Sequence, residues 1–232
     1  MLAPFSLAAA QTLCNRYTIT GHTMPTSYNE ITGRSLERLA ALSDGIFAVA
    51  MTLLVLDLHV PASEAIHSQG ELWHTLAEAS PQLISYLLSF MTLGIFWNGQ
   101  QAQLNSFTRS DRHLSWIHIA FLFAVSIMPF STRLLAGFIA YRSVLIAYWA
   151  NILLLGMVLY ISWKYAEHAG LLRENVTHEQ QCAMERRIVV AQGLYAFGAC
   201  LCLINTYVSI VFIVLVQLNF ALAPRLPFLS EV

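Results

Sequence analysis

The chain has 232 residues, of which 57% are hydrophobic and only 11% are charged. An average soluble domain is about 45–50% apolar and about 25% charged, so this composition excludes an ordinary water-soluble surface. The formal net charge of -1 also excludes the global basic field of a nucleic-acid-binding protein. Because the apolar residues fall in long blocks, we expect an all-α membrane protein with six transmembrane helices.

The two ends of the chain are expected to lie outside the helical region. Residues 1–33 have no regular pattern and no basic segment ahead of their apolar start, so they predict a disordered leader rather than a signal peptide. Residues 34–223 are expected to form the six-helix transmembrane domain, and residues 224–232 a short cytoplasmic tail.

Four apolar blocks predict the first four spans, and these lie at residues 35–58, 81–98, 114–138 and 143–164. Pro129 lies inside the third block and is expected to kink or end that helix. Polar stretches predict loops at 59–77, 99–113 and 165–187.

The last apolar block covers residues 188–223, about 36 residues. A single helix of that length would reach about 54 Å, against a hydrocarbon core of about 30 Å. We therefore expect the block to fold back at Asn205-Thr206 and to form two short helices.

The basic residues predict the orientation of the spans. With six spans, one side of the membrane holds Arg133 and Arg142, and the other side holds the remaining ten of the twelve lysines and arginines. Cytoplasmic loops carry the excess of basic residues, so both termini are expected in the cytoplasm and the protein in the cytoplasmic membrane.

The first span carries the strongest functional pattern. Thr52 borders a stripe of apolar residues at spacings of three and four, and small residues lie on the neighbouring faces. The stripe consists of Ile46, Val49, Leu53 and Leu56. Such a stripe is more often typical of a helix that faces lipid or packs in a bundle core. Arg38 and Asp44, however, lie near the membrane entrance, where a charge usually has a partner.

This span resembles the signature helix of a known channel family. From Arg38 it reads Arg-Leu-Ala-Ala-Leu-Ser-Asp-Gly-Ile-Phe-Ala-Val-Ala-Met-Thr-Leu-Leu-Val-Leu. That pattern is similar to the bacterial relatives of the endosomal/lysosomal transmembrane potassium channel. Later segments are similar as well, namely Ser89-Phe90, Gly94-Ile95-Phe96-Trp97 and Pro129-Phe130-Ser131-Thr132.

The resemblance implies a potassium-permeable cation channel that is a homotetramer in the lipid bilayer, conducts passively, and has neither a cofactor nor an enzymatic activity. It further implies a pore lined by the first helix, without a Thr-Val-Gly-Tyr-Gly filter. On this pattern Val49, Leu53 and Leu56 would form apolar constriction rings, and Thr52 a hydroxyl ring linked to potassium preference. From its position alone, we also expect Asp57 to form an acidic ring at the outer mouth that concentrates cations.

The resemblance also implies a polar cluster at the cytoplasmic end, in which Arg38, Ser43 and Asp44 hold the first span against its neighbours. The family usually has histidines after the Trp of span two, whereas this chain reads Trp97-Asn98-Gly99-Gln100-Gln101. We expect Gln100 and its neighbour to replace the hydrogen bonds of those histidines. His118, inside span three, is a candidate partner for Asp44 or Arg38.

Three other functions, namely a metal site, an enzyme and a transporter, fit the sequence less well than a channel does. The eight histidines lack the spacing of a metal site, and no catalytic or nucleotide-binding motif predicts an enzyme. A secondary transporter of a small cation or solute is the main alternative. Transporters usually show internal repeats and broken helices, and the sequence shows no repeat.

Overall fold

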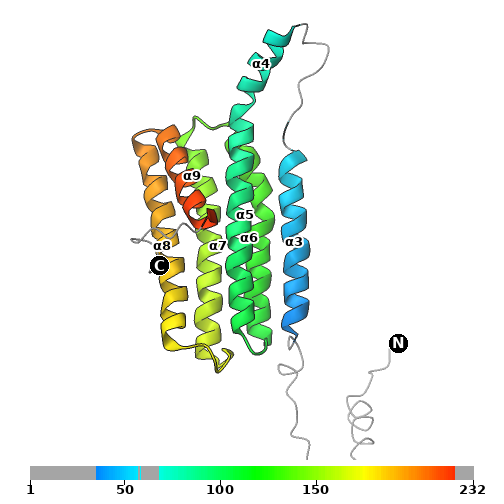
Figure 1. The fold of residues 1–232 in the computed structure, drawn as a ribbon, viewed down its shortest axis with the longest axis vertical. Helices are drawn as coiled ribbons and strands as arrows, with labels where there is room; N and C mark the ends of the chain where they lie inside the picture. Colours follow the sequence, from blue (N-terminus) through cyan, green and yellow to red (C-terminus); the bar gives the residue numbers. More distant parts are fainter. Residues whose placement is uncertain (1–34, 57, 59–67, 223–232) are drawn as a thin grey trace, which may run out of the picture.

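The structure is a computed structural model that describes residues 35–56, 58 and 68–222, and this part of the chain forms a bundle of helices (Figure 1). The predicted leader, the predicted tail and Asp57 lie outside the described residues. In chain order the helices are α3 (Leu36–Leu56), α4 (Gln69–Glu78), α5 (Ser80–Ser106), α6 (Arg112–Gly137), α7 (Arg142–His168), α8 (His178–Cys200), the 3-10 helix η3 (Leu201–Leu203) and α9 (Thr206–Leu222).

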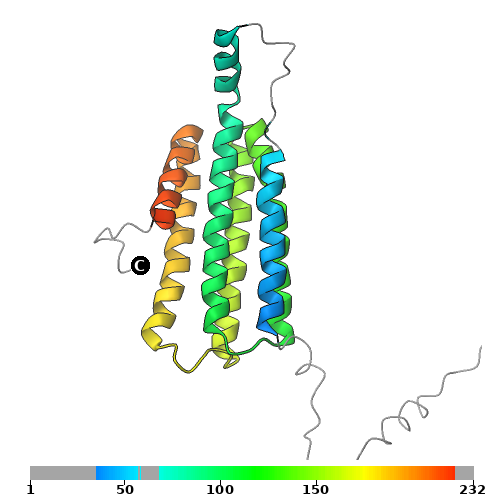
Figure 2. The ribbon, with the colours of Figure 1, turned by 45° about the vertical axis from the view of Figure 1, so that its right-hand side comes forward.

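Four of these helices are long and apolar enough to cross a membrane, namely α3, α6, α7 and α8 extended by η3. A fifth candidate span is the pair α4 and α5, which are bent by 48° where they meet, so that α4 projects beyond the bundle (Figure 2). Helix α9 has 17 residues, or about 26 Å at 1.5 Å per residue, which is short of a core of about 30 Å. The described residues therefore contain four to five candidate spans, and the count of six stays a prediction.

The predicted loops were too long, and each is partly helical. Residues 69–78 form α4, whose first turn is capped by Ser68, because its hydroxyl accepts a hydrogen bond from the amide of Glu71. Helix α5 continues to Ser106 because its polar residues are buried, and Gln103 Nε2 donates to the carbonyl of Leu159 over 3.0 Å. In the third loop, α7 extends to His168 and α8 begins at His178.

The predicted fold-back at Asn205-Thr206 is confirmed. Helix α9 begins at Thr206, and Asn205 Oδ1 accepts a hydrogen bond of 2.8 Å from the amide of Tyr207. Figure 1 shows α9 running back beside α8 and ending part-way along it. Helix α6, by contrast, does not end at Pro129 but continues to Gly137.

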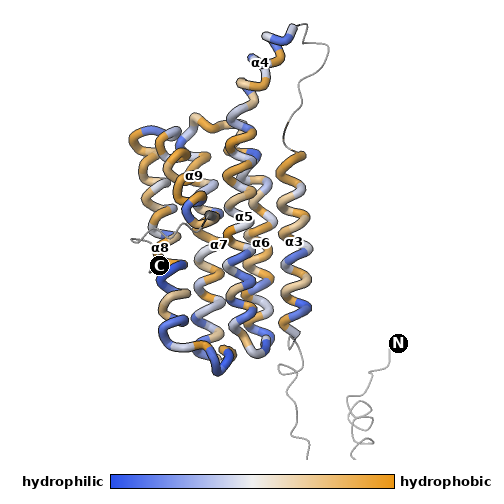
Figure 3. Tube along the Cα trace, viewed as in Figure 1, coloured by the Kyte–Doolittle hydropathy of each residue, from blue (hydrophilic) through white to orange (hydrophobic). Residues whose placement is uncertain are grey.

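The helices alternate in direction, so the α5–α6 and α7–α8 connections lie at the same end of the bundle as the start of α3 (Figure 1). Hydrophilic residues are concentrated at this end (Figure 3). Helix α6 occupies the centre of the bundle and packs against α3, α5 and α7, whereas α9 packs against α8 and α5. The largest fully buried side chains include Trp163, Tyr148, Tyr195, Phe47 and Phe121.

Gly198 is required by the close approach of α8 and α9. A Cβ at this position would lie 2.8 Å from Ile213 Cγ1 and 3.0 Å from Phe212 Cδ1. We expect Gly198→Ala to lower the free energy of unfolding by about 1–3 kcal/mol, the usual effect of overpacking. Gly193, on the same helix, has no atom within 4 Å of such a Cβ, so Gly193→Ala is the matched control. It should be neutral or stabilising by up to about 1 kcal/mol in a denaturation titration in detergent. Equal effects of the two substitutions would contradict the packing of α9 on α8.

Candidate functional site

Helix α3 has one buried face, which attaches it to the bundle. The buried residues recur at spacings of three and four, and they are Leu39, Ser43, Phe47, Ala50 and Leu54. This face packs against α5 and α6, and Phe47 contacts the ring of Phe121 with ring centroids 6.0 Å apart. The spacing is that of a single helical stripe, so the rest of the helix surface is left without a partner inside the subunit.

The exposed side of α3 carries the residues predicted to line a pore. Val49 is 57% exposed, Leu53 44% and Leu56 73%. Thr52 is also exposed and lies nine residues after the buried Ser43. Nine residues make two and a half turns at 3.6 residues per turn, so Thr52 lies directly opposite the buried face. Ile46, the fourth residue of the predicted stripe, is instead partly buried against the main core.

The hydroxyl group of Thr52 is bonded within its own helix. Its Oγ1 lies 2.9 Å from the carbonyl oxygens of Ala48 and Val49, and it donates its proton there. Because the only proton of the hydroxyl points to the backbone, the free lone pair of Oγ1 remains available as an acceptor. An exposed acceptor of this kind suits a cation better than an anion.

A second cluster, which we call the α3–α5 clamp, joins Ser43 and Asp44 to α5. Asp44 Oδ1 accepts hydrogen bonds from Trp97 Nε1 at 2.8 Å and from Gln101 Nε2 at 2.9 Å. Gln100 Nε2 donates to Ser43 Oγ at 2.7 Å, and that hydroxyl donates to the carbonyl of Leu39. Gln100 and Gln101 thus both donate hydrogen bonds to side chains of α3.

Two residues predicted for this cluster are not in it. Arg38 is exposed, and its described hydrogen bond runs from its backbone amide to Ser35 Oγ. His118 is buried, and its Nδ1 lies 3.0 Å from the carbonyl of Leu114. Its ring meets that of Phe107 edge to face and not Asp44 or Arg38. The carbonyl that His118 approaches is that of the residue four positions earlier, so the described contact of its Nδ1 stays within α6.

A buried hydroxyl network inside the bundle was not predicted from the sequence. Thr132 Oγ1 donates to Ser89 Oγ at 2.7 Å, Ser89 Oγ lies 3.0 Å from Tyr148 Oη, and Gln217 Nε2 donates to Thr92 Oγ1. The network links α5, α6, α7 and α9. Polar residues inside apolar spans were the available signal, because such residues usually face the interior of a bundle.

The described residues contain no group of three or more His, Cys, Asp or Glu side chains that would hold a metal ion.

Comparison with known proteins identifies a channel family. Residues 38–129 match the model of the family described as "Endosomal/lysosomal potassium channel TMEM175". A potassium channel from Streptomyces collinus is 36% identical over 44% of this chain and 48% of its own length. The proton channel TMEM175 of Gallus gallus is 30% identical over 45% of this chain, which is 22% of the Gallus protein. The matches thus span about half and about a fifth of the length of these two relatives.

A solved structure supports the similarity over a larger part of the chain. The crystal structure of a lysosomal potassium-selective channel TMEM175 homologue from Chamaesiphon minutus superposes with a TM-score of 0.70 and 26% identity. The match covers 81% of this chain and 97% of the other. The resemblance predicted from the first span is therefore confirmed: the chain is similar to members of the TMEM175 family, which is a family of channels and not of enzymes.

Proposed function

We propose that this chain is one subunit of a homotetrameric, potassium-permeable cation channel, and that four copies of α3 line its pore. The observation that carries the proposal is the division of α3 into a face buried against α5 and α6 and an opposite face that exposes Thr52 and Leu56. The names of the relatives, which are potassium or proton channels, agree with this proposal.

The chemistry of the exposed face suits a narrow cation pathway. Apolar rings of Val49, Leu53 and Leu56 would exclude water and so close the pore to ions until it widens. A ring of four Thr52 oxygens would replace part of the hydration shell of a potassium ion. The excess of basic residues at the end where α3 begins supports a cytoplasmic location for that end and, in a six-span subunit, for both termini.

An apolar groove beside α3 offers space for the neighbouring subunit. It lies between α3 and α6 and has a volume of about 440 Å³. Its walls include Leu42, Gly45, Val49, Leu53 and Pro129. In membranes, small residues such as Gly45 allow helices to approach closely, so a second copy of α3 would pack well here.

The mass of the complex tests the assembly. In native mass spectrometry from detergent micelles we expect four copies of the 25.9 kDa chain. A monomer or dimer that still conducts ions would exclude a pore made by four first helices.

Ion flux tests the activity and separates the channel from its main alternative. In proteoliposomes the channel should pass potassium down its gradient without a coupled ion, and parallel measurements with sodium and with a pH-sensitive dye would show which cations pass. Uptake of potassium against its gradient, driven by a second ion, would instead indicate a secondary transporter.

A further inference from the structure

A large cleft lies away from α3, between α5, α7 and α8. It has a volume of about 550 Å³ and lies in the half of the bundle that contains the hydrophilic ends of the helices. Helix α9 lines the cleft through Phe220 and ends part-way along α8 (Figure 1). Because α9 ends there, the lipid bilayer would meet the cleft beyond Phe220.

The walls of the cleft change from polar to apolar along its length. The part near the helix ends contains Asn105, Asn175, Gln180 and Arg187. The deeper part is mostly apolar, with Ile95, Ile188, Ala191 and Phe220, and it also contains Asn98 and Gln192. On α8 all the charged residues come before Ile188, where an apolar run begins. A cleft whose lining changes from polar to apolar matches a molecule with a polar head and an apolar chain.

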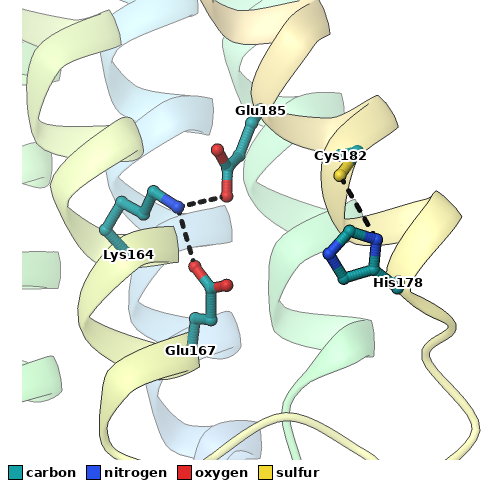
Figure 4. A network of polar contacts seen from close by, with 5 residues as sticks. All are labelled: Lys164, Glu167, His178, Cys182 and Glu185. Carbon is teal, nitrogen blue, oxygen red and sulfur yellow. Dashed lines mark hydrogen bonds and ion pairs between the residues drawn. The ribbon is translucent and has the colours of Figure 1, made fainter.

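The charge in the cleft comes from Arg187. The nearby Lys164 binds Glu167 at 2.9 Å and also Glu185, so these two carboxylates are already paired (Figure 4). Arg187 is exposed and takes part in none of the ion pairs among the described residues. An unpaired guanidinium at the boundary between polar and apolar surface is a strong partner for a phosphate group.

A buried polar atom in the wall provides an independent indication of a ligand. Trp163 lines the cleft and is only 1% exposed, and its Nε1 has no hydrogen-bond partner in the described part of the chain. Buried polar groups are rarely left unpaired, so the presence of this one favours a polar molecule in the cleft.

We propose that this cleft binds one phospholipid with an anionic headgroup, whose phosphate is held by Arg187 and whose acyl chain lies between α5 and α8 below the end of α9. The site is separate from the exposed face of α3, so the proposal does not rest on the pore. A phospholipid bound in the cleft would contact both α8 and α5, at a level where no described helix lies between them.

The binding of phosphatidylglycerol to delipidated protein tests the site. Native mass spectrometry with added phosphatidylglycerol should detect one bound lipid per subunit, whereas phosphatidylcholine should bind more weakly. Arg187→Gln should weaken binding of phosphatidylglycerol about tenfold, as expected for a lost charge-assisted contact with phosphate. Arg186→Gln is the matched control, because Arg186 is equally charged and exposed but does not line the cleft.

Two more variants test the shape of the cleft and whether residues 223–232 compete with the lipid for it. Ala102→Phe narrows the cleft from α5 without changing the charge, and it should also weaken lipid binding. If Arg187→Gln and Arg186→Gln bind alike, or if glycerol phosphate competes as well as the intact lipid, the proposal is wrong. If a chain that ends at Leu222 binds an additional lipid, residues 223–232 occupy the cleft in the full chain, which would also overturn the proposal.

Discussion

Replacing Thr52 with valine should lower potassium flux through the reconstituted protein about tenfold. Valine has the shape of threonine, so the helix should fold as before, but the exposed acceptor Oγ1 is lost and the apolar rings become continuous. A tenfold slower rate corresponds to about 1.4 kcal/mol in the barrier, shared among the four oxygens of the ring. The measurement is potassium efflux from proteoliposomes at matched protein density.

Thr75→Val is the control for this experiment. The hydroxyl of Thr75 on α4 also donates to the carbonyl four residues earlier, that of Glu71, but it lies outside the exposed face of α3. Its replacement should leave flux unchanged. Undiminished flux and unchanged selectivity in Thr52→Val would show that the Thr52 oxygens do not contact the permeating ion.

The second large effect is expected at the α3–α5 clamp. Asp44→Ala removes the acceptor shared by Trp97 and Gln101, so α3 keeps only the Gln100–Ser43 hydrogen bond of this cluster. A hydrogen bond to a charged group contributes about 1.5–3 kcal/mol when it is shielded from water. Asp44 is exposed, so its hydrogen bonds should contribute less than this. We therefore expect a loss of about 1–2 kcal/mol in stability, together with altered flux because α3 is less firmly held.

Two further variants distinguish the clamp from a general effect of charge. Asp44→Asn retains Oδ1 as an acceptor and should recover most of the stability. Glu37→Ala removes one negative charge from the same helix, at an exposed position, and should have little effect. Thermal unfolding in detergent provides the measurement. Equal midpoints for Asp44→Ala and Glu37→Ala would contradict a structural role for these hydrogen bonds.

The sequence predicted the helices better than it predicted the loops. Long apolar blocks located the spans because a helix in a membrane must be apolar for about 20 residues. Gln103 was assigned to a loop because it is polar, whereas its amide is buried and bonded to the carbonyl of Leu159. A polar residue can end a helix or join two helices, and only the three-dimensional contacts decide which of the two occurs.

The candidate site shows the same limit. The resemblance of the first span identified Ser43, Asp44, Trp97 and Gln100, and these residues do meet in the structure. It also suggested His118, which bonds to its own helix, and it did not indicate the network of Ser89, Thr132 and Tyr148. Which face of a helix a residue occupies follows from the sequence, but which neighbouring helix it meets depends on packing.

The most direct test of the pore is chemical modification of a cysteine at position 52. In a chain whose own cysteines (Cys14, Cys182, Cys200 and Cys202) are replaced, Thr52→Cys should conduct and then be blocked by a water-soluble thiol reagent. The control is Val211→Cys, an exposed position on the apolar helix α9, where we expect lipid to cover the thiol and keep it unmodified. Blockage of Thr52→Cys alone is the result that a pore lined by α3 predicts. Potassium flux that continues unchanged after full modification of position 52 would contradict it.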